Sequence, residues 1–240
     1  MLLAVSLLSA LVVGLIGYSS GRESLRKAAF DQLTTVRELR VSALEDTMAN
    51  VSKGVVLDSR NLSAQTASRL LNEGFENLQS RSLTTAQEAE LQKYYAETFV
   101  PQLVTATGQS YGPAAFMPTS NAGRWLQYHY TAQFTDFDKA LDVDDANDGG
   151  TPFSKAAQQY GDYLSRLVKQ VGYEDVLFLN LKGDVVYSAY KGVDLGSNVT
   201  TGPYRDTMLA TAYRDVLATN SVSAVRTTDF ERYIPSLNVP

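Results

Sequence analysis

The sequence has no cysteine, and histidine and tryptophan each occur only once in its 240 residues. The lack of cysteine excludes disulfides, thiolate nucleophiles and cysteine-ligated metals. The single histidine, His129, excludes a metal site built from several histidines. Acidic residues outnumber basic ones, 26 to 21, so the net charge is −5, and no cluster of Lys and Arg offers a surface for phosphates. Nucleic acid is therefore not an expected partner, and no cofactor or metal is expected.

Charged side chains are absent from residues 1–21, and the first one is Arg22. The segment is rich in Leu and Val, and it just reaches the roughly 20 residues that a membrane-spanning helix needs. The alternatives are a cleaved signal peptide and a buried helix. Signal peptides, however, begin with basic residues and have a shorter apolar stretch. We therefore expect a retained transmembrane helix over 1–21 and a location in the cell membrane.

Residues 22–110 are predicted to form a helical stalk and the helical part of the next domain. Apolar residues recur there at steps of three and four, as on one face of a helix: Leu25, Ala29, Leu33, Val36, Leu39 and Ala43. No proline interrupts 22–59, so one helix is expected, of about 55 Å at 1.5 Å per residue. A core helix and a stalk that transmits motion to the membrane both fit this geometry.

Two shorter helices are predicted in the rest of this region. The first covers 63–79, after a break at Asn61. The second begins at Thr85, which forms a capping-box pattern with Glu88, and it is expected to end near Pro101. Residues 105–121 are rich in Gly, Pro, Ser and Thr and are predicted to form a loop.

Residues 111–240 are predicted to form an α/β domain. Helices are expected over 153–171 and 204–218. Two β-rich runs, 175–181 and 185–190, flank a turn with Gly183 and predict a hairpin, and 223–230 is predicted to be a further strand. The fold class is therefore α+β, with an antiparallel sheet. Three strands make an unfinished sheet, so we expect the natural protein to continue beyond Pro240.

Three motifs that would indicate catalysis or metal binding fail on inspection. The acidic stretch does not fit an EF-hand loop, because Ala146 and Lys155 fall where oxygen ligands are required. It is predicted to be a solvated loop, and its members are Asp136, Asp138, Asp142, Asp144, Asp145 and Asp148. No Gly-x-Ser-x-Gly elbow supports a hydrolase, and no phosphate-binding glycine loop occurs. His129 lies in an aromatic run and is expected to be packed rather than catalytic.

The aromatic residues are the best candidates for ligand contact, since small-molecule pockets are mostly apolar with a few placed polar groups. The predicted ligand-binding residues are Trp125, Tyr128, Tyr130, Tyr173, Asp175, Tyr187, Asp194, Tyr204 and Asp229. Tyr190 and Arg205 are further candidates. Core packing is the alternative for each aromatic side chain. Tyr187 and Tyr190 have opposite parity on their strand, so only one of them can face a given pocket.

The second half of the chain resembles the Cache-type sensor domains of bacterial transmembrane receptors. The pieces that carry the resemblance, in order, are 126–132, 172–176, 183–191, 194–196, 202–204, 228–230 and 233–235. Residues 118–121 and 142–146 make it most similar to the N-terminal sensors of actinobacterial class III adenylate/guanylate cyclases. The resemblance implies a PAS-like sensor outside the membrane, a second span, and a signalling domain inside.

The function that this resemblance implies is ligand sensing for a cyclase whose catalytic domain lies outside this chain. Similar sensors belong to chemoreceptors and histidine kinases, so these outputs stay open. We expect an unidentified small-molecule ligand and a homodimer, with the helical stalk as an interface. A membrane-tethered structural module is the alternative from another class. No catalytic residue is expected within this chain.

Overall fold

The computed structural model describes residues 2–134, 137–143, 145–219 and 221–237. The chain divides into two compact units, residues 1–54 and 55–240. The described residues are mostly helical and include one small antiparallel sheet of two strands.

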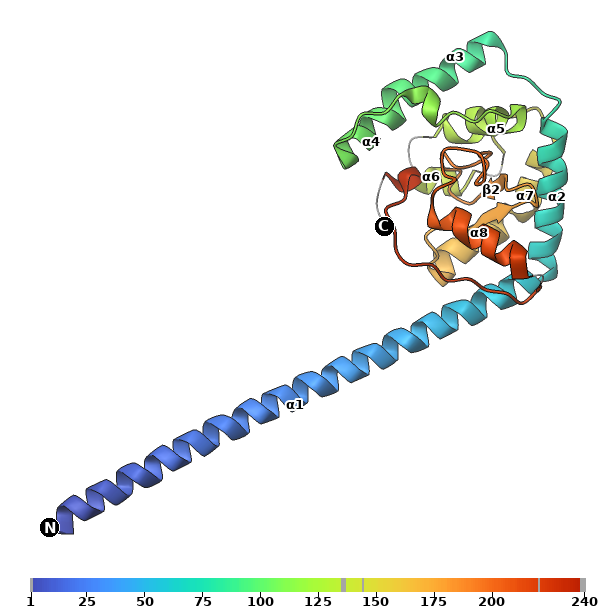
Figure 1. The fold of residues 1–240 in the computed structure, drawn as a ribbon. Helices are drawn as coiled ribbons and strands as arrows, with labels where there is room; N and C mark the ends of the chain where they lie inside the picture. The colour runs from blue at the N-terminus through green and yellow to red at the C-terminus, as the bar shows by residue number, and fades with distance from the viewer. Residues whose placement is uncertain (1, 135–136, 144, 220, 238–240) are drawn as a thin grey trace. The chain divides into compact units, whose positions relative to one another are not determined.

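Helix α1 (Leu2–Arg60) begins in the apolar segment and continues without a break through the predicted stalk, as Figure 1 shows. This confirms the single helix predicted over 22–59. Its side chains up to Val51 are exposed, and its N-terminal part is long and apolar enough to cross a membrane. A cleaved signal sequence would satisfy the same criteria of length and composition.

Helix α2 (Leu62–Leu78) begins where the break was predicted. The side chain of Asn61 accepts a hydrogen bond of 2.8 Å from the Ser63 backbone N–H and so caps the helix. Helix α7 (Pro152–Arg166) has Thr151 as its cap and packs along α2 (Figure 1). The two backbones approach closely at Gly74, where an added Cβ would lie 2.6 Å from the Cα of Phe153.

Helix α3 (Thr85–Tyr94), the π-helical turn η1 (Tyr95–Phe99) and α4 (Val100–Thr107) form one continuous helical segment. Two sequence predictions are wrong here. The capping box is formed by Thr84 and Gln87, one residue before the predicted pair. The segment also continues past Pro101 to Gly108, which ends it with a left-handed φ of 69°. The π-helical turn η1 ends at Phe99, two residues before Pro101. This wider turn accommodates the proline ring, which would crowd the preceding turn of a regular α-helix.

Short helical elements connect this segment to the hairpin. In chain order they are η2 (Pro113–Ala115), α5 (Asn121–Leu126), the π-helical turn η3 (Gln127–Thr131), α6 (Phe137–Leu141) and the π-helical turn η4 (Leu167–Val171). One hydrophobic cluster joins α2, α5, α7 and β2, and a second joins α3, η1, α4 and Phe116 to Tyr204. The turn η3 therefore lies between two parts of the core.

Strands β1 (Leu177–Leu179) and β2 (Val185–Ser188) confirm the predicted hairpin, with Phe178 opposite Tyr187. The backbone of Val185 also pairs with Gly196 and Ser197, so the following loop extends the sheet on that edge. An irregularity between Phe178 and Leu179 shortens the regular pairing to fewer residues than the sequence predicted.

Helix α8 (Met208–Thr219) begins later than the predicted position 204, because Thr207 caps it: its hydroxyl accepts from the Ala210 N–H at 3.3 Å. The strand predicted over 223–230 is wrong. Residues 224–230 have no regular secondary structure, the segment is largely exposed, and no described strand pairs with it. The described part of the chain ends in the 3₁₀ turn η5 (Ile234–Ser236) and Leu237.

Candidate functional site

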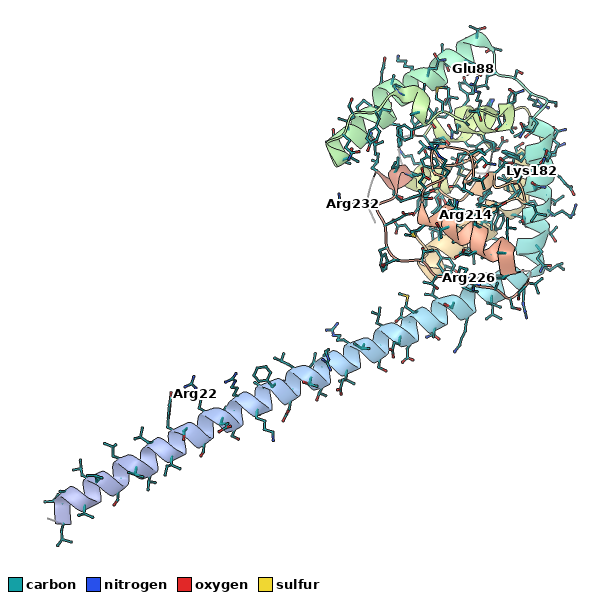
Figure 2. All side chains as sticks on the ribbon, in the orientation of Figure 1. Arg22, Glu88, Lys182, Arg214, Arg226 and Arg232 are labelled. Carbon is teal, nitrogen blue, oxygen red and sulfur yellow. The ribbon has the colours of Figure 1, made fainter. Side chains whose placement is uncertain are left out.

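A cavity of about 410 Å³ lies between the beginning of β1, the loop after β2 and the segment around η5. Its lining consists of Glu174, Asp175, Leu177, Tyr190, Gly192, Asp194, Tyr233, Pro235, Ser236 and Leu237. The volume falls within the range of pockets that hold small molecules. Figure 2 labels Arg232, which directly precedes the last of these three segments.

Asp175 holds the two ends of the hairpin together at the edge of this cavity. Its Oδ1 accepts backbone hydrogen bonds from Val176, Ala189 and Tyr190, and its Oδ2 accepts one of 2.8 Å from the Ser188 hydroxyl. Burial raises the pKa of the Asp175 carboxyl, and these hydrogen bonds oppose the shift. The carboxylate therefore has a structural task in addition to its place in the cavity wall.

Asp194 is the most deeply buried acidic group at the cavity, with only 3% of the residue exposed. Its Oδ2 accepts a hydrogen bond of 3.0 Å from the hydroxyl of Tyr233. Loss of hydration, followed by the nearby charge of Asp175, raises the pKa of Asp194 to about 7. No lysine or arginine is among the described residues that line this cavity. The carboxylate of Asp194 therefore has no cationic partner among these described lining residues.

The loop that carries Asp194 is held in place by two buried polar side chains of η3. The amide Nε2 of Gln127 donates to the backbone oxygens of Val193 and Leu195 at 2.7 and 2.9 Å. The hydroxyl of Thr131 donates to the backbone oxygen of Lys191 at 2.7 Å. These hydrogen bonds fix the backbone on both sides of Asp194 and so define its position in the cavity.

Burial raises the pKa values of three tyrosines around Asp194. The hydroxyls of Tyr95 and Tyr204 are fully buried near its carboxyl, and Tyr95 donates to the Oε1 of Gln127. The hydroxyl of Tyr233 has its pKa raised by burial and then by the charge of Asp194. All three phenols are therefore neutral donors at physiological pH.

Only two of the nine predicted ligand-binding residues, Asp175 and Asp194, line the cavity. Four of the aromatic residues lie in hydrophobic clusters: Trp125, Tyr130, Tyr187 and Tyr204. Tyr130 packs edge-on against Phe153, with 5.4 Å between ring centroids.

The other three predicted residues lie elsewhere. Tyr128 donates to Glu90 at 2.9 Å, Tyr173 lies 3.4 Å from Asp58, and Asp229 is exposed in the segment after α8. Arg205 is also exposed, beside Asp206. Their proposed ligand contacts stay predictions, but the cavity does not bring these residues together.

Sequence reasoning did not select several residues that shape this cavity. Tyr190 was a further candidate and does line it, whereas Tyr233, Leu237 and Gln127 were not selected. The segment 233–235 carried part of the family resemblance, which is the one sequence signal that could have indicated Tyr233. Gln127 lies within the aromatic run 123–130, and no sequence signal distinguished it from its neighbours.

The acidic stretch was predicted to be a solvated loop, but one of its carboxylates, that of Asp148, is buried and has a structural role. Asp148 is buried and accepts hydrogen bonds from the backbone N–H and the hydroxyl of Thr151, the cap of α7. Asp136 and Asp144 lie outside the described residues, as does the side chain of Asp138. In the described part of the chain, no group of three acidic or histidine side chains could hold a metal ion.

His129 lies on η3 and stacks near Trp125, with 4.6 Å between ring centroids. Burial lowers the pKa of its imidazole. It does not line the cavity, so it takes no part in a site with Asp175 and Asp194.

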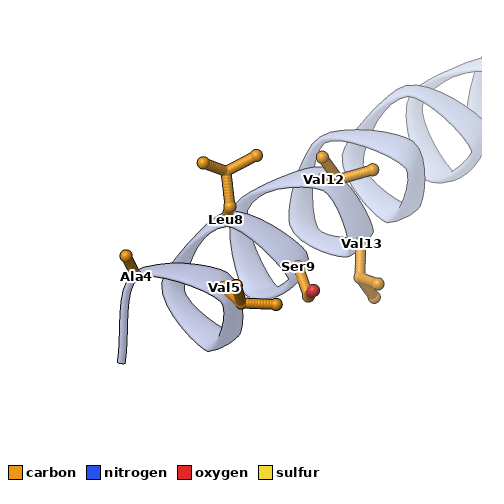
Figure 3. Close-up of a pocket in the computed structure, with 6 residues that line it drawn as sticks. All are labelled: Ala4, Val5, Leu8, Ser9, Val12 and Val13. Carbon is orange, nitrogen blue, oxygen red and sulfur yellow. The ribbon is translucent and has the colours of Figure 1, made fainter. Parts of the chain in front are cut away.

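A second hollow lies on α1 and is not an enclosed site. Its lining residues all come from one face of that helix: Ala4, Val5, Leu8, Ser9, Val12 and Val13 (Figure 3). They belong to the candidate membrane span. An apolar helix surface of this kind is what lipid chains would cover.

Comparisons with protein-family models, with curated proteins and with solved structures each find no match for this chain.

Proposed function

We propose that this chain is the extracytoplasmic ligand-sensing region of a membrane-bound signalling receptor, with a Cache-type sensor domain. The observation that supports this best is the continuity of α1. The helix runs from the apolar segment to Arg60, and Asn61 then caps α2, which forms part of the core of the domain that contains the cavity. A continuous helix is a suitable element to carry a change in the domain towards the membrane.

The proposed output is a nucleotide cyclase whose catalytic domain lies outside this chain. The support is the resemblance of 118–121 and 142–146 to the sensors of actinobacterial cyclases. A methyl-accepting chemoreceptor or a histidine kinase is the alternative output. In each case the ligand must bind one conformational state more tightly than the other in order to shift the equilibrium.

The proposed partner of α1 is a second copy of the chain. Apolar residues follow alternating steps of three and four along its second half, which is the spacing of a coiled-coil seam: Val41, Leu44, Met48, Val51 and Val55. Each of the five residues is between 40% and 60% exposed. Two copies anchored in one membrane by the same end would place these helices parallel.

The charges beside this seam fit a parallel pair. In a parallel coiled coil, the residue just before the first apolar residue of a heptad (position g) lies opposite position e of the partner helix. In sequence number, that position e comes five residues later. Those positions hold Arg40 and Glu45. The two residues have opposite charges, and this complementarity supports a second copy as the partner.

The experiment uses the absence of native cysteine. Met48→Cys places one thiol in the proposed seam, and Lys53→Cys, the matched control, places one on the outer face of the same helix. The full chain is reconstituted in liposomes. A thermal-shift screen of amino acids, amines, carboxylates and sugars identifies the compound that stabilises it most, and disulfide formation is followed with and without that compound.

We expect Met48→Cys to form the dimer disulfide at least about tenfold faster than Lys53→Cys, and the stabilising compound to change that rate at least about twofold. If the chosen compound leaves the rate unchanged, or if no compound stabilises the folded chain, the sensor function is wrong. A membrane-tethered structural module then becomes the better description.

A further inference from the structure

We propose that the cavity beside β1 binds a small organic cation, in which an ammonium group is attached to an apolar body. This assignment rests on the proposed ligand-sensing function and names the class of ligand. It follows from the charge, the lining and the hydrogen bonding of the cavity.

The charge of the lining is negative. Glu174, Asp175 and Asp194 contribute three carboxyl groups from two segments, and none of the described lining residues is basic. A buried carboxylate is stable only when it is paired or well hydrogen-bonded. Burial, followed by the nearby charge of Asp175, raises the pKa of Asp194 to about 7. A bound ammonium group would supply the missing counter-charge, and the same lining would repel an anion.

The remaining lining fits an apolar body. Leu177, Pro235 and Leu237 provide apolar surface, and the rings of Tyr190 and Tyr233 provide aromatic surface. Aromatic faces attract ammonium groups by the electrostatic cation–π interaction. The apolar and aromatic lining together with the buried acid therefore selects for a ligand that has a charged end and an apolar end.

The hydrogen bonds of Asp175 argue against a metal ion as the occupant. Its two oxygens already accept three backbone hydrogen bonds and one from Ser188. A divalent cation needs several oxygen ligands with free lone pairs. An ammonium group needs only one or two acceptors. The Asp194 carboxylate can provide them, although it already accepts hydrogen bonds from the Tyr233 hydroxyl and from the backbone N–H groups of Asp194 and Leu195.

The test compares three compounds of one shape and different charge on the full chain in detergent micelles: 2-phenylethylamine, 2-phenylethanol and 3-phenylpropanoate. Binding is measured by isothermal titration calorimetry at pH 8, where Asp194 is ionised. We expect the amine to bind at least about tenfold more tightly than the alcohol, and the carboxylate to bind most weakly.

The matched variants are Asp194→Asn in the cavity and Asp215→Asn at an exposed position of α8 outside it, which remove the same charge. We expect the first to weaken amine binding at least about tenfold and the second to leave it unchanged. Thermal unfolding verifies that each variant is folded. Should Asp194→Asn fail to fold, Glu174→Gln at the exposed side of the cavity replaces it, with an expected loss of at least about threefold.

The proposal is overturned if the alcohol or the carboxylate binds as tightly as the amine, if the folded chain binds none of the three, or if the cavity variant binds the amine normally. These failures differ from failure of the sensor function. A sugar or carboxylate that stabilises the chain and changes the Met48→Cys disulfide rate would leave the sensor function standing and remove only the cation. If the amine binds in a way that depends on Asp194 but does not change that disulfide rate, the cation proposal stands and the sensor function is wrong.

Discussion

The hydroxyl of Tyr233 donates a hydrogen bond of 3.0 Å to the carboxylate of Asp194, which lies 39 residues earlier in the chain. This contact connects the last described segment to the loop after β2 and completes the cavity wall. Because Asp194 is buried, its protonation state links pH to the stability of the domain and to the charge of the cavity.

The stability of the domain is predicted to fall as pH rises from about 4 to about 7. An aspartate in the unfolded chain has a pKa of about 3.9, whereas that of Asp194 in the folded chain is about 7. Between these values the folded state binds more protons, so the free energy of unfolding decreases with rising pH and levels off above 7. Asp175, whose pKa is also raised, adds to the same slope, while the neighbouring Tyr95, Tyr204 and Tyr233 stay neutral.

Thermal melts between pH 4.5 and pH 8 check this prediction. Asp194→Asn should flatten the decrease in melting temperature, and Asp229→Asn, which removes an exposed charge, should retain the wild-type slope. Equal slopes in the wild type and in Asp194→Asn would show that Asp194 does not titrate in this range.

Replacement of Gly196 by alanine is predicted to destabilise the domain strongly. Gly196 has a φ of +77°, and an added Cβ would lie 2.4 Å from the Cα of Gly123 on α5. Gly108→Ala is a matched control, since its φ is +69° but no heavy atom lies within 4 Å of an added Cβ. The control should lose about 1–2 kcal/mol from backbone strain, and Gly196→Ala about 1–3 kcal/mol more from the clash. Urea denaturation measures both; equal losses would contradict the close approach.

Gln127→Leu is predicted to destabilise the domain and to weaken ligand binding. The leucine would leave the backbone oxygens of Val193 and Leu195 and the hydroxyl of Tyr95 without the partner that Gln127 provides. Each buried group left unsatisfied costs about 1–3 kcal/mol. Gln133→Leu at an exposed position is the control and should have little effect. Denaturation curves that coincide for the two variants would show that Gln127 does not support the loop.

Charge reversal in α1 is predicted to weaken the dimer, and a compensating reversal to restore it. Arg40→Glu places two negative charges opposite each other across the proposed seam, and adding Glu45→Arg restores the opposite pairing. Lys53→Glu, on the outer face, is the control. Sedimentation in detergent at low salt measures the dimer fraction. A double variant as weak as Arg40→Glu alone would argue against the parallel register.

The helices could be predicted well because their signals are local. The break at Asn61, the helices α2 and α7 and the hairpin all follow from caps, turns and apolar spacing within a few residues. The errors arose where local signals compete. Thr84 and Thr85 both offer a cap, and Pro101 usually ends a helix, but a π turn accommodates it here. The segment 223–230 has strand-like composition, but a strand also needs a hydrogen-bonded neighbour.

The cavity could be predicted only in part, because three segments distant in sequence form it. Spacing along one strand indicates which side chains share a face, but it does not indicate that Tyr233 returns to Asp194. Large aromatic residues were reasonable candidates for ligand contact, yet the same property places Tyr130, Tyr187 and Tyr204 in the core. The buried carboxylates were the better indicators, because burial of a charge requires a partner.

The most direct test of an anchored, extracytoplasmic sensor is the labelling of Val222→Cys in bacterial spheroplasts. Val222 is 91% exposed, and the introduced thiol is the only one in the chain. A maleimide that cannot cross membranes should label the variant in intact spheroplasts as fully as after lysis, and the labelled chain should sediment with the membranes. Labelling only after lysis would place the domain inside the cell, and a labelled chain in the soluble fraction would show that residues 1–21 are not a retained anchor.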